Sequence, residues 1–254
     1  MHPAKLFTVL PVMLAVAWGA VAARAETVDC TPITALPAVI TVQGIYCFTG
    51  NLQTAITSGN AIDIQTNNVT LDLNGFKLGN LAAGPGTTAV GIHATNRQNI
   101  TIENGTIRGF FVGISLAGGG ASQGHVVEDI RADQNTFVGI EVHGSGNIVR
   151  NNQVVATGGS TCCADAIAIG IRVIGAGPRV LNNDVIDTMT VGTGTTTGIL
   201  FASVTGGLAV NNRITVAGTG IEYVGSTGKY RDNLTFGVPT ATRFVGGTAV
   251  GTND

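Results

Sequence analysis

The sequence is poor in aromatic and charged residues. Of its 254 residues only 5% are aromatic and 11% are charged, and there is a single Trp. Lys and Arg total 13 against 15 Asp and Glu, which gives a formal net charge of −2. No strongly basic surface can be built from this composition, so we expect no nucleic acid or anionic lipid held by charge.

Typical helix-forming composition is also missing. Gly alone accounts for 37 residues, and much of the rest is Val, Ile, Thr, Asn and Ala. Such a composition suits many short strands joined by tight corners and offers little material for long helices. The composition therefore predicts an all-β protein.

One long apolar run lies at the start of the chain. Lys5 precedes the apolar residues 6–23, and Ala23-Arg24-Ala25 follows. A basic start, an apolar centre and small residues before the cleavage point predict a signal peptide, residues 1–25. A retained membrane anchor is the alternative, but Pro11 interrupts the run, which is short of a full span.

The predicted mature chain is weakly acidic. Two of the 13 basic residues lie in residues 1–25, so 11 remain against 15 acidic ones. We expect this chain to have no membrane span and to be secreted or periplasmic, in the cell envelope. No cofactor or metal is predicted, and the oligomeric state is open.

Cysteine is scarce, with four residues in all. In an exported chain cysteines are expected to pair. A bridge between Cys30 and Cys47 would close a loop of 17 residues and stabilise the fold by about 3 kcal/mol. We predict this bridge within an N-terminal cap, residues 26–60, because the end of a strand stack has to be covered.

Cys162 and Cys163 are adjacent and lie in an insertion. We predict a structural bridge that involves them. Pairing with another chain, free thiols and metal binding together with Asp165 are the alternatives.

A Gly-Ile pair recurs along the chain at intervals of 22, 26, 31, 28 and 22 residues, beginning at Gly91. Periods of this size indicate a stack of repeated coils. Side chains alternate along a strand, so the Ile should point inward and the next residue outward. The outward column is then His93, Ser115, Glu141, Arg172, Leu200 and Glu222.

An asparagine-rich corner recurs with the same rhythm. It appears as Asn104-Gly105, Asn151-Asn152, Asn182-Asn183, Asn211-Asn212 and Asp232-Asn233. Asparagine tolerates the left-handed backbone of a sharp corner, and its amide can bond to neighbouring backbone. We interpret these residues as a structural ladder, with one member per coil.

These repeats resemble the right-handed parallel β-helix family, the pectin-lyase-like superfamily, over residues 61–236. The resemblance implies a single-stranded right-handed parallel β-helix with an N-terminal cap, followed by a tail or weak cap at residues 237–254. It also implies a long polysaccharide as the default ligand, by analogy of fold alone.

The sharper motifs of polygalacturonase-like members are absent from the sequence. The strings that come nearest to them are Asn182-Asn183-Asp184, Gly124-His125-Val126 and Arg213-Ile214-Thr215. None of them matches, so hydrolysis of that type is not expected.

The outward column supports a local chemical hypothesis. In parallel register Glu141 and Arg172 would lie about 4.8 Å apart, with His143 one pleat along. Arg172 would neutralise a uronate carboxylate while His143 or Glu141 takes the proton α to it, as in a lyase or epimerase. His93, Ser115 and Glu222 are the further substrate-binding candidates.

We expect the repeated glycines to leave this side of the sheet low and open, as a shallow groove. Insertions at residues 157–168 and 188–197 would form its walls. The alternative is a solvated cross-strand ion pair between Glu141 and Arg172. The protein would then be a non-catalytic carbohydrate-binding or envelope protein, or a structural spike or adhesin.

Overall fold

A computed structural model describes residues 29–162, 167–190 and 194–254. These residues form two parallel β-sheets, and the only helices among them are single 3-10 turns at Leu81–Ala83 and Thr240–Thr242. The expected signal peptide, residues 1–25, lies outside the described residues. Within the described ranges, no helix has the length and apolar character needed to cross a membrane.

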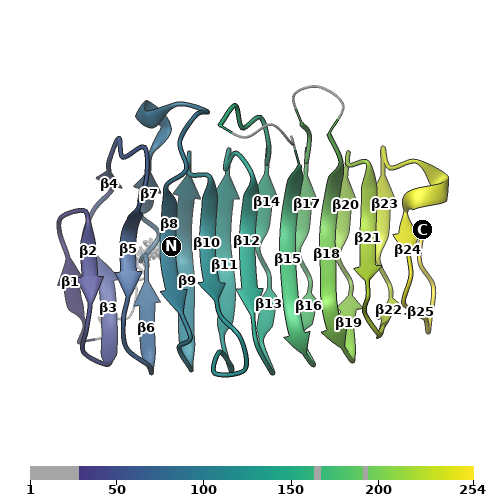
Figure 1. Cartoon of the computed structure of the whole chain (residues 1–254), viewed down its shortest axis with the longest axis horizontal. Coiled ribbons are helices and arrows are strands. Elements are labelled where there is room, and N and C mark those ends of the chain that lie inside the picture. The colour runs from purple at the N-terminus through teal and green to yellow at the C-terminus, as the bar shows by residue number, and fades with distance from the viewer. Residues whose placement is uncertain (1–28, 163–166, 191–193) are drawn as a thin grey trace, which may run out of the picture.

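The first sheet holds one strand from each coil, and all its strands run parallel (Figure 1). In order these are β2 (Ala38–Ile40), β5 (Asn60–Ile64), β8 (Val90–Thr95), β10 (Val112–Ala117), β12 (Val138–His143), β15 (Ala168–Ala176), β18 (Thr196–Thr205), β21 (Thr219–Val224) and β24 (Phe244–Val245). We call this the nine-stranded sheet.

The second sheet has 16 strands and two branches. Its main path is β1 (Thr31–Ile33), β3 (Gly44–Phe48), β6 (Val69–Asp72), β9 (Ile100–Arg108), β11 (Val126–Asp133), β13 (Ile148–Arg150), β16 (Arg179–Leu181), β19 (Gly207–Val210), β22 (Gly228–Arg231) and β25 (Thr248–Ala249). The side branch contains β4 (Leu52–Gln53), β7 (Lys77–Gly79), β14 (Gln153–Val155), β17 (Asp184–Ile186), β20 (Arg213–Thr215) and β23 (Leu234–Phe236). Successive coils stacked in this way form a parallel β-helix, as expected; its right-handed sense stays a prediction.

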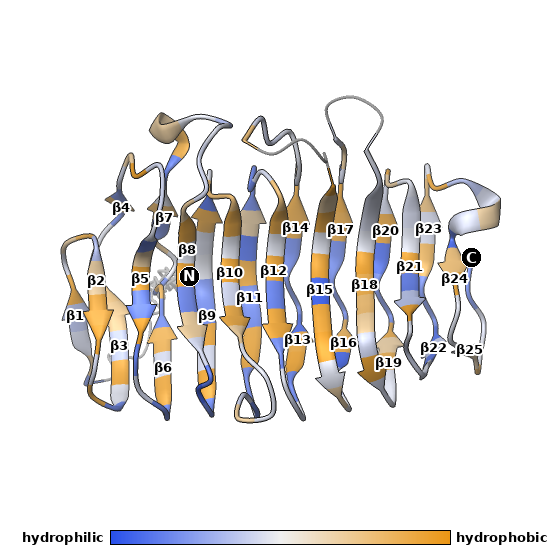
Figure 2. Ribbon diagram, in the orientation of Figure 1, coloured by the Kyte–Doolittle hydropathy of each residue, from blue (hydrophilic) through white to orange (hydrophobic). Residues whose placement is uncertain are grey.

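The isoleucines of the Gly-Ile pairs fill the interior, as expected. Ile114, Ile140 and Ile171 are paired in register on successive strands and are fully buried. The register also places Ser115 beside Glu141 and Glu141 beside Arg172. Figure 2 shows the resulting alternation of hydrophobic and hydrophilic positions along these strands.

The expected opening of the outer face by the glycines is wrong. A Cβ on Gly139 would lie 2.5 Å from Val154 Cγ1, a core atom, and 2.7 Å from the carbonyl oxygen of Gly170. Glycine is therefore needed because the backbone approaches the core closely, and it opens no groove outside. The positions before Gly113, Gly139 and Gly170 carry Val112, Val138 and Ile169, which form a small apolar cluster separate from the main core.

The asparagine ladder is present and is buried. The Nδ2 of Asn152 donates to Asn183 Oδ1 at 3.0 Å, and the same contact links Asn183 to Asn212 and Asn212 to Asn233. Each acceptor oxygen also takes the backbone N–H of the preceding ladder residue. The residue before each rung has φ near +55°, at Asn151, Asn182, Asn211 and Asp232, as the corner requires.

The stack extends beyond the expected limits of residues 61–236. At its start β1 pairs with β3 and β2 pairs with β5, so residues expected only to cap the helix already form coils. At its end β24 pairs with β21 and β25 with β22. The predicted disulfide between Cys30 and Cys47 is confirmed. Cys163 lies outside the described residues, so the predicted bridge at Cys162 and Cys163 stays a prediction.

Candidate functional site

Three of the predicted site residues meet on the outer face of the nine-stranded sheet. Glu141 and His143 lie two residues apart on β12, so both side chains point to the same side. His143 Nε2 lies 2.5 Å from Glu141 Oε1. Arg172 Nη1 on β15 lies 3.8 Å from the same oxygen. The parallel register brings these groups together, as the sequence predicted.

Glu141 is held as a carboxylate. Burial by itself would raise its pKa, because only 12% of the side chain is exposed. The hydrogen bond from His143 and the positive charge of Arg172, with a smaller contribution from His143 in its protonated form, outweigh this effect, and they lower the pKa below its ordinary value. A carboxylate with a lowered pKa is a weak base and is better suited to orienting its neighbours.

His143 is oriented by that carboxylate. Because Glu141 accepts through Oε1, the bonded Nε2 carries a hydrogen, and a neutral His143 then has its lone pair on Nδ1. Nδ1 has no hydrogen-bond partner among the described residues. The pair therefore holds one ring nitrogen in place and leaves the other able to accept a proton.

Arg172 is close to an anion without being bonded to it. A separation of 3.8 Å exceeds hydrogen-bond length, and the buried Nε has no partner in the described part of the chain. About 29% of the side chain is exposed. Its guanidinium can therefore donate hydrogen bonds to a carboxylate that arrives from solvent.

The remaining predicted residues occupy the same outward column on neighbouring strands. Ser115 stands in register between His93 and Glu141 and is only 8% exposed. Thr197 Oγ1 donates to Glu222 Oε2 at 3.1 Å, and Leu200 stands in register between Arg172 and Glu222. Glu222 is therefore not part of the cluster around Arg172.

One acidic residue of this face was missed by the sequence analysis. Asp63 Oδ1 lies 2.7 Å from His93 Nδ1, and the two residues are paired in register. Burial would raise the pKa of Asp63, but hydrogen bonds from His93, Gln65 and Asn60, together with the charge of His93, lower it. Its coil opens with Ala61-Ile62 in place of Gly-Ile, so a search for that pair passes over it. The alternation of Ile62, Asp63 and Ile64 was the available signal.

The described ends of the two insertions lie away from His143. They lead into β15 and β18, so they meet the nine-stranded sheet where those strands begin. Ile169, at the start of β15, is paired with Val138, whereas His143 is paired with Ile174. Five residues of strand, about 16 Å, separate these two pairs. Residues 163–166 and 191–193 of the insertions lie outside the described residues, so the expected groove with insertions on either side of Glu141, His143 and Arg172 stays a prediction.

The three strings that failed to match polygalacturonase motifs have structural roles. Asn183 belongs to the buried ladder, and Arg213 Nε donates to Asp184 Oδ1 at 2.6 Å across two strands. His125 is 1% exposed, and it accepts a hydrogen bond from the backbone N–H of Ile100 through Nδ1 at 3.2 Å. Burial lowers the pKa of His125 to about 4, against the smaller opposing effect of a backbone hydrogen bond at Arg97.

Comparison with known proteins gives similarity of fold. No family model matches the chain, and no curated protein matches its sequence. The enzymatically active domain of tailspike protein 2 from bacteriophage CBA120 aligns over 88% of this chain with a TM-score of 0.59 and 16% identity. This chain spans 39% of the length of that domain.

Weaker structural similarity extends to other enzymes. The catalytic domain of a GH87 α-1,3-glucanase aligns with a TM-score of 0.39 and 13% identity, over 88% of this chain and 64% of that one. Pectate lyase Pel9A aligns with a TM-score of 0.38 and 11% identity, over 85% of this chain and 66% of that one. The chain is a parallel β-helix, consistent with the pectin-lyase-like fold that its repeats resemble.

Proposed function

We propose that this is an exported carbohydrate-binding β-helix protein, and that it processes an acidic polysaccharide by lyase or epimerase chemistry on the nine-stranded sheet. The observation that carries the proposal is the guanidinium of Arg172, which lies beside a bonded Glu141 and His143 pair and has no hydrogen bond of its own in the described chain. The tailspike, glucanase and pectate lyase named above make a carbohydrate ligand the first to test.

Each residue has a distinct role in the proposed reaction. Arg172 binds the uronate carboxylate and stabilises the negative charge that develops on it. The Nδ1 of His143 accepts the proton from the carbon α to that carboxylate. In a lyase the C–H electrons form a carbon–carbon double bond, and the glycosidic oxygen on the β carbon leaves and takes a proton from water. In an epimerase a proton returns to the opposite face of the same carbon.

Glu141 acts through His143 in this scheme. Its carboxylate fixes the ring and stabilises the imidazolium that forms when Nδ1 takes the proton. The lowered pKa of Glu141 keeps it charged through this step. Glu141 is therefore a positioning residue, and His143 is the base.

Export is part of the proposal and is supported by the disulfide between Cys30 and Cys47. Disulfides persist in oxidising compartments, such as the periplasm and the extracellular space. A secreted or periplasmic location places the protein where long polysaccharides occur.

Binding without catalysis is the second candidate. The distance of the described insertion ends from His143 favours it, because groups that far away do not exclude water from the reacting carbon. Arg172 would then hold the carboxylates of a glycan, and His143 would serve only to orient Glu141. A purely structural spike or adhesin is the remaining alternative, and it requires no glycan.

The test follows the product directly. Purified protein is incubated with polygalacturonate, alginate, glucuronan and hyaluronan, and the ultraviolet absorbance of unsaturated uronate is recorded. Proton NMR of the polymers detects epimerisation. We expect one polymer to react, and we expect Arg172→Ala and His143→Ala to lower turnover at least 100-fold.

Arg150→Ala is the matched control. Arg150 also pairs with a carboxylate across two strands, with its Nε 2.5 Å from Glu128 Oε2, but it lies on the other sheet. It should leave turnover unchanged. An Arg172→Ala protein with full turnover would eliminate the mechanism. Binding without any product would select the second candidate.

A further inference from the structure

The inference concerns three residues in the first coils of the nine-stranded sheet, Asp63, His93 and Thr95. The strands β5 and β8 are neighbours in this sheet, and their register places Asp63 directly beside His93 (Figure 1). Thr95 lies two residues beyond His93 on β8, so both side chains point to the same side. The fold therefore brings the three side chains together on its outer face.

Two hydrogen bonds join these side chains in a chain. Asp63 Oδ1 lies 2.7 Å from His93 Nδ1, and Thr95 Oγ1 lies 2.9 Å from His93 Nε2. One ring nitrogen is thus bonded to a carboxylate and the other to a hydroxyl. His143 differs, because its ring is bonded to Glu141 alone within the described chain.

Asp63 is held in place as a carboxylate. Gln65 Nε2 donates to its Oδ2 at 2.7 Å, and Asn60 Nδ2 donates to its Oδ1 at 3.2 Å. Burial raises the pKa of Asp63, but these hydrogen bonds and the one from His93 lower it more. A charged carboxylate can only accept hydrogen bonds, so Nδ1 of His93 carries the ring hydrogen.

This tautomer fixes the direction of the second hydrogen bond. With the hydrogen on Nδ1, a neutral His93 has its lone pair on Nε2, so the hydroxyl of Thr95 donates to it. A hydroxyl within about 2.6 to 3.2 Å of a base, with that base oriented by a third group, is the arrangement that activates an oxygen nucleophile.

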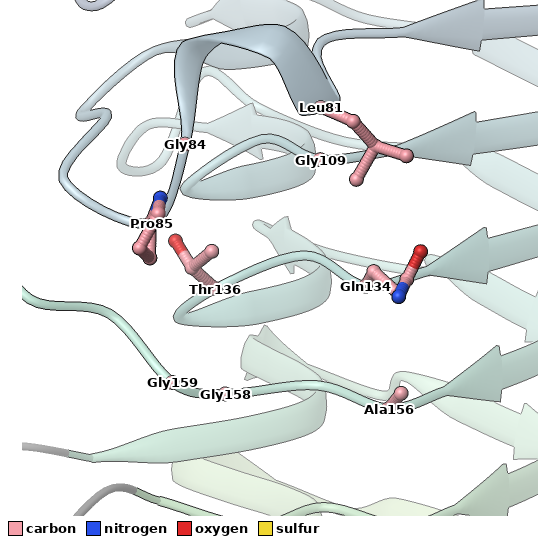
Figure 3. A pocket seen from close by; sticks show the side chains of 9 residues that line it. All are labelled: Leu81, Gly84, Pro85, Gly109, Gln134, Thr136, Ala156, Gly158 and Gly159. Carbon is pink, nitrogen blue, oxygen red and sulfur yellow. The ribbon is translucent and has the colours of Figure 1, made fainter.

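The hydroxyl is also accessible. Thr95 is exposed, and about 27% of the His93 side chain and 24% of the Asp63 side chain are exposed. A substrate can therefore reach Thr95 without a movement of the chain. The corner pocket in Figure 3 offers no such chemistry, because no ionisable side chain lines it and its Thr136 has no base beside it.

We propose that Thr95 is a nucleophile that accepts the acyl group of a small carboxylic ester, such as an acetyl ester of a sugar hydroxyl. Its Oγ1 attacks the acyl carbon while its proton passes to His93 Nε2. The bond between the acyl carbon and the alcohol oxygen breaks, and the alcohol leaves with that proton. Water then attacks the acyl-threonine through the same base, which releases the carboxylic acid and restores Thr95. Asp63 is a positioning residue.

This site is separate from the proposed uronate chemistry. Ser115 stands in register between His93 and Glu141, so two coil spacings, about 10 Å, lie between the two histidine clusters. Uronate turnover and ester cleavage can therefore be lost independently of each other.

The test uses 4-nitrophenyl acetate as the probe. Nitrophenolate release is followed in the first turnover, and peptide mass spectrometry locates the acetyl group. We expect a burst of nitrophenolate and one acetyl group on Thr95. Thr95→Val should abolish both, whereas Thr95→Ser keeps a hydroxyl and should retain them. His93→Ala should lower the rate of acetylation about 100-fold, as expected when a general base is removed.

Thr205→Val is the matched control. Thr205 is exposed and ends β18 as Thr95 ends β8, but it has no hydrogen bond to a histidine in the described chain. This variant should be acetylated on Thr95 at the wild-type rate. Because both threonines are exposed, both valine variants should keep the midpoint of denaturation, which shows that they fold.

Two variants of Asp63 test its positioning role. Asp63→Glu keeps the negative charge that holds the ring hydrogen on Nδ1, and Asp63→Asn keeps the shape without the charge. We expect the glutamate variant to be acetylated faster than the asparagine variant. A role in packing alone would give the opposite order.

The proposal is overturned if no acetyl group appears on Thr95. It is also overturned if Thr205 is acetylated as fast as Thr95, or if His93→Ala is acetylated at the wild-type rate.

Discussion

The same parallel register builds two very different rows of polar side chains. Inside, Asn183 bonds to rungs on both sides, and both its amide nitrogen and its oxygen are used. Outside, Glu141 is bonded to His143, while Arg172 beside it has no hydrogen bond within the described chain. Strands that stack in the same register can therefore give one row of polar side chains all its hydrogen-bond partners and leave members of another row without them.

The difference separates residues that stabilise the fold, such as Asn183, from residues that the fold only positions, such as Arg172. A buried ladder is stable only when every member is satisfied, because an unpaired amide in the interior is costly. An outer row borders solvent and tolerates unmatched donors. The guanidinium of Arg172, which borders solvent and has no hydrogen bond within the described chain, is the group that we assign to a ligand.

The largest expected effect comes from breaking the inner row. Asn183→Ala would leave the backbone N–H of Asn152 without its acceptor and the carbonyl of Val149 without its donor. We expect a loss of about 3 kcal/mol in the free energy of unfolding, measured by urea denaturation. Asn182→Gly, at the adjacent exposed corner with φ of +55°, should change it by only a few tenths. Equal losses in the two variants would contradict the ladder's role.

The second largest effect is expected from acid, which should lower the free energy of unfolding through His125. The folded pKa of His125 is about 4, below its ordinary value, so the unfolded chain binds more protons between these two pKa values. Stability is therefore full above pH 6.5 and falls as pH drops toward 4, by about 2 kcal/mol at pH 5. Denaturation curves at several pH values measure this change.

His125→Asn is the control for the acid effect. An asparagine oxygen can accept the hydrogen bond from the Ile100 N–H that Nδ1 of His125 now accepts, as Asn147 already does for the N–H of His125. The variant should fold and lose this part of the pH dependence. An unchanged profile would show that other groups cause it.

Removing the charge of Arg172 from the outer face should lower the free energy of unfolding much less. Arg172→Ala loses an ion pair at 3.8 Å on a side chain that is 29% exposed, and we expect a change under about 1 kcal/mol. Urea denaturation of this variant and of Asn183→Ala measures the difference between the two losses in free energy of unfolding. A loss as large as that of the ladder variant would mean that Arg172 serves the fold.

The smallest expected effect is an increase in the free energy of unfolding. Val216 has φ of +60°, a left-handed conformation that is unfavourable for a β-branched residue. Val216→Gly removes this strain but adds freedom to the unfolded chain, so we expect a net gain of about 0.5 kcal/mol. A measured loss would show that contacts of Val216 outweigh its backbone strain.

The features that could be predicted from the sequence are those that repeat along the chain. The Gly-Ile and Asn pairs fixed the coil period, so the ladder and the pairing of Glu141 with Arg172 could be read from spacing alone. The side of the sheet to which the glycines face could not be predicted, because it depends on how closely Gly139 approaches Val154, which lies in another strand of the coil.

The most direct test compares two arginines that sit beside carboxylates on different sheets. The affinity for a uronate polymer that the wild type binds is measured by calorimetry for Arg172→Ala and for Arg150→Ala. If the nine-stranded sheet is the glycan-binding face, Arg172→Ala weakens binding at least tenfold and Arg150→Ala leaves it unchanged. Equal affinities in the two variants would contradict the assignment of this face.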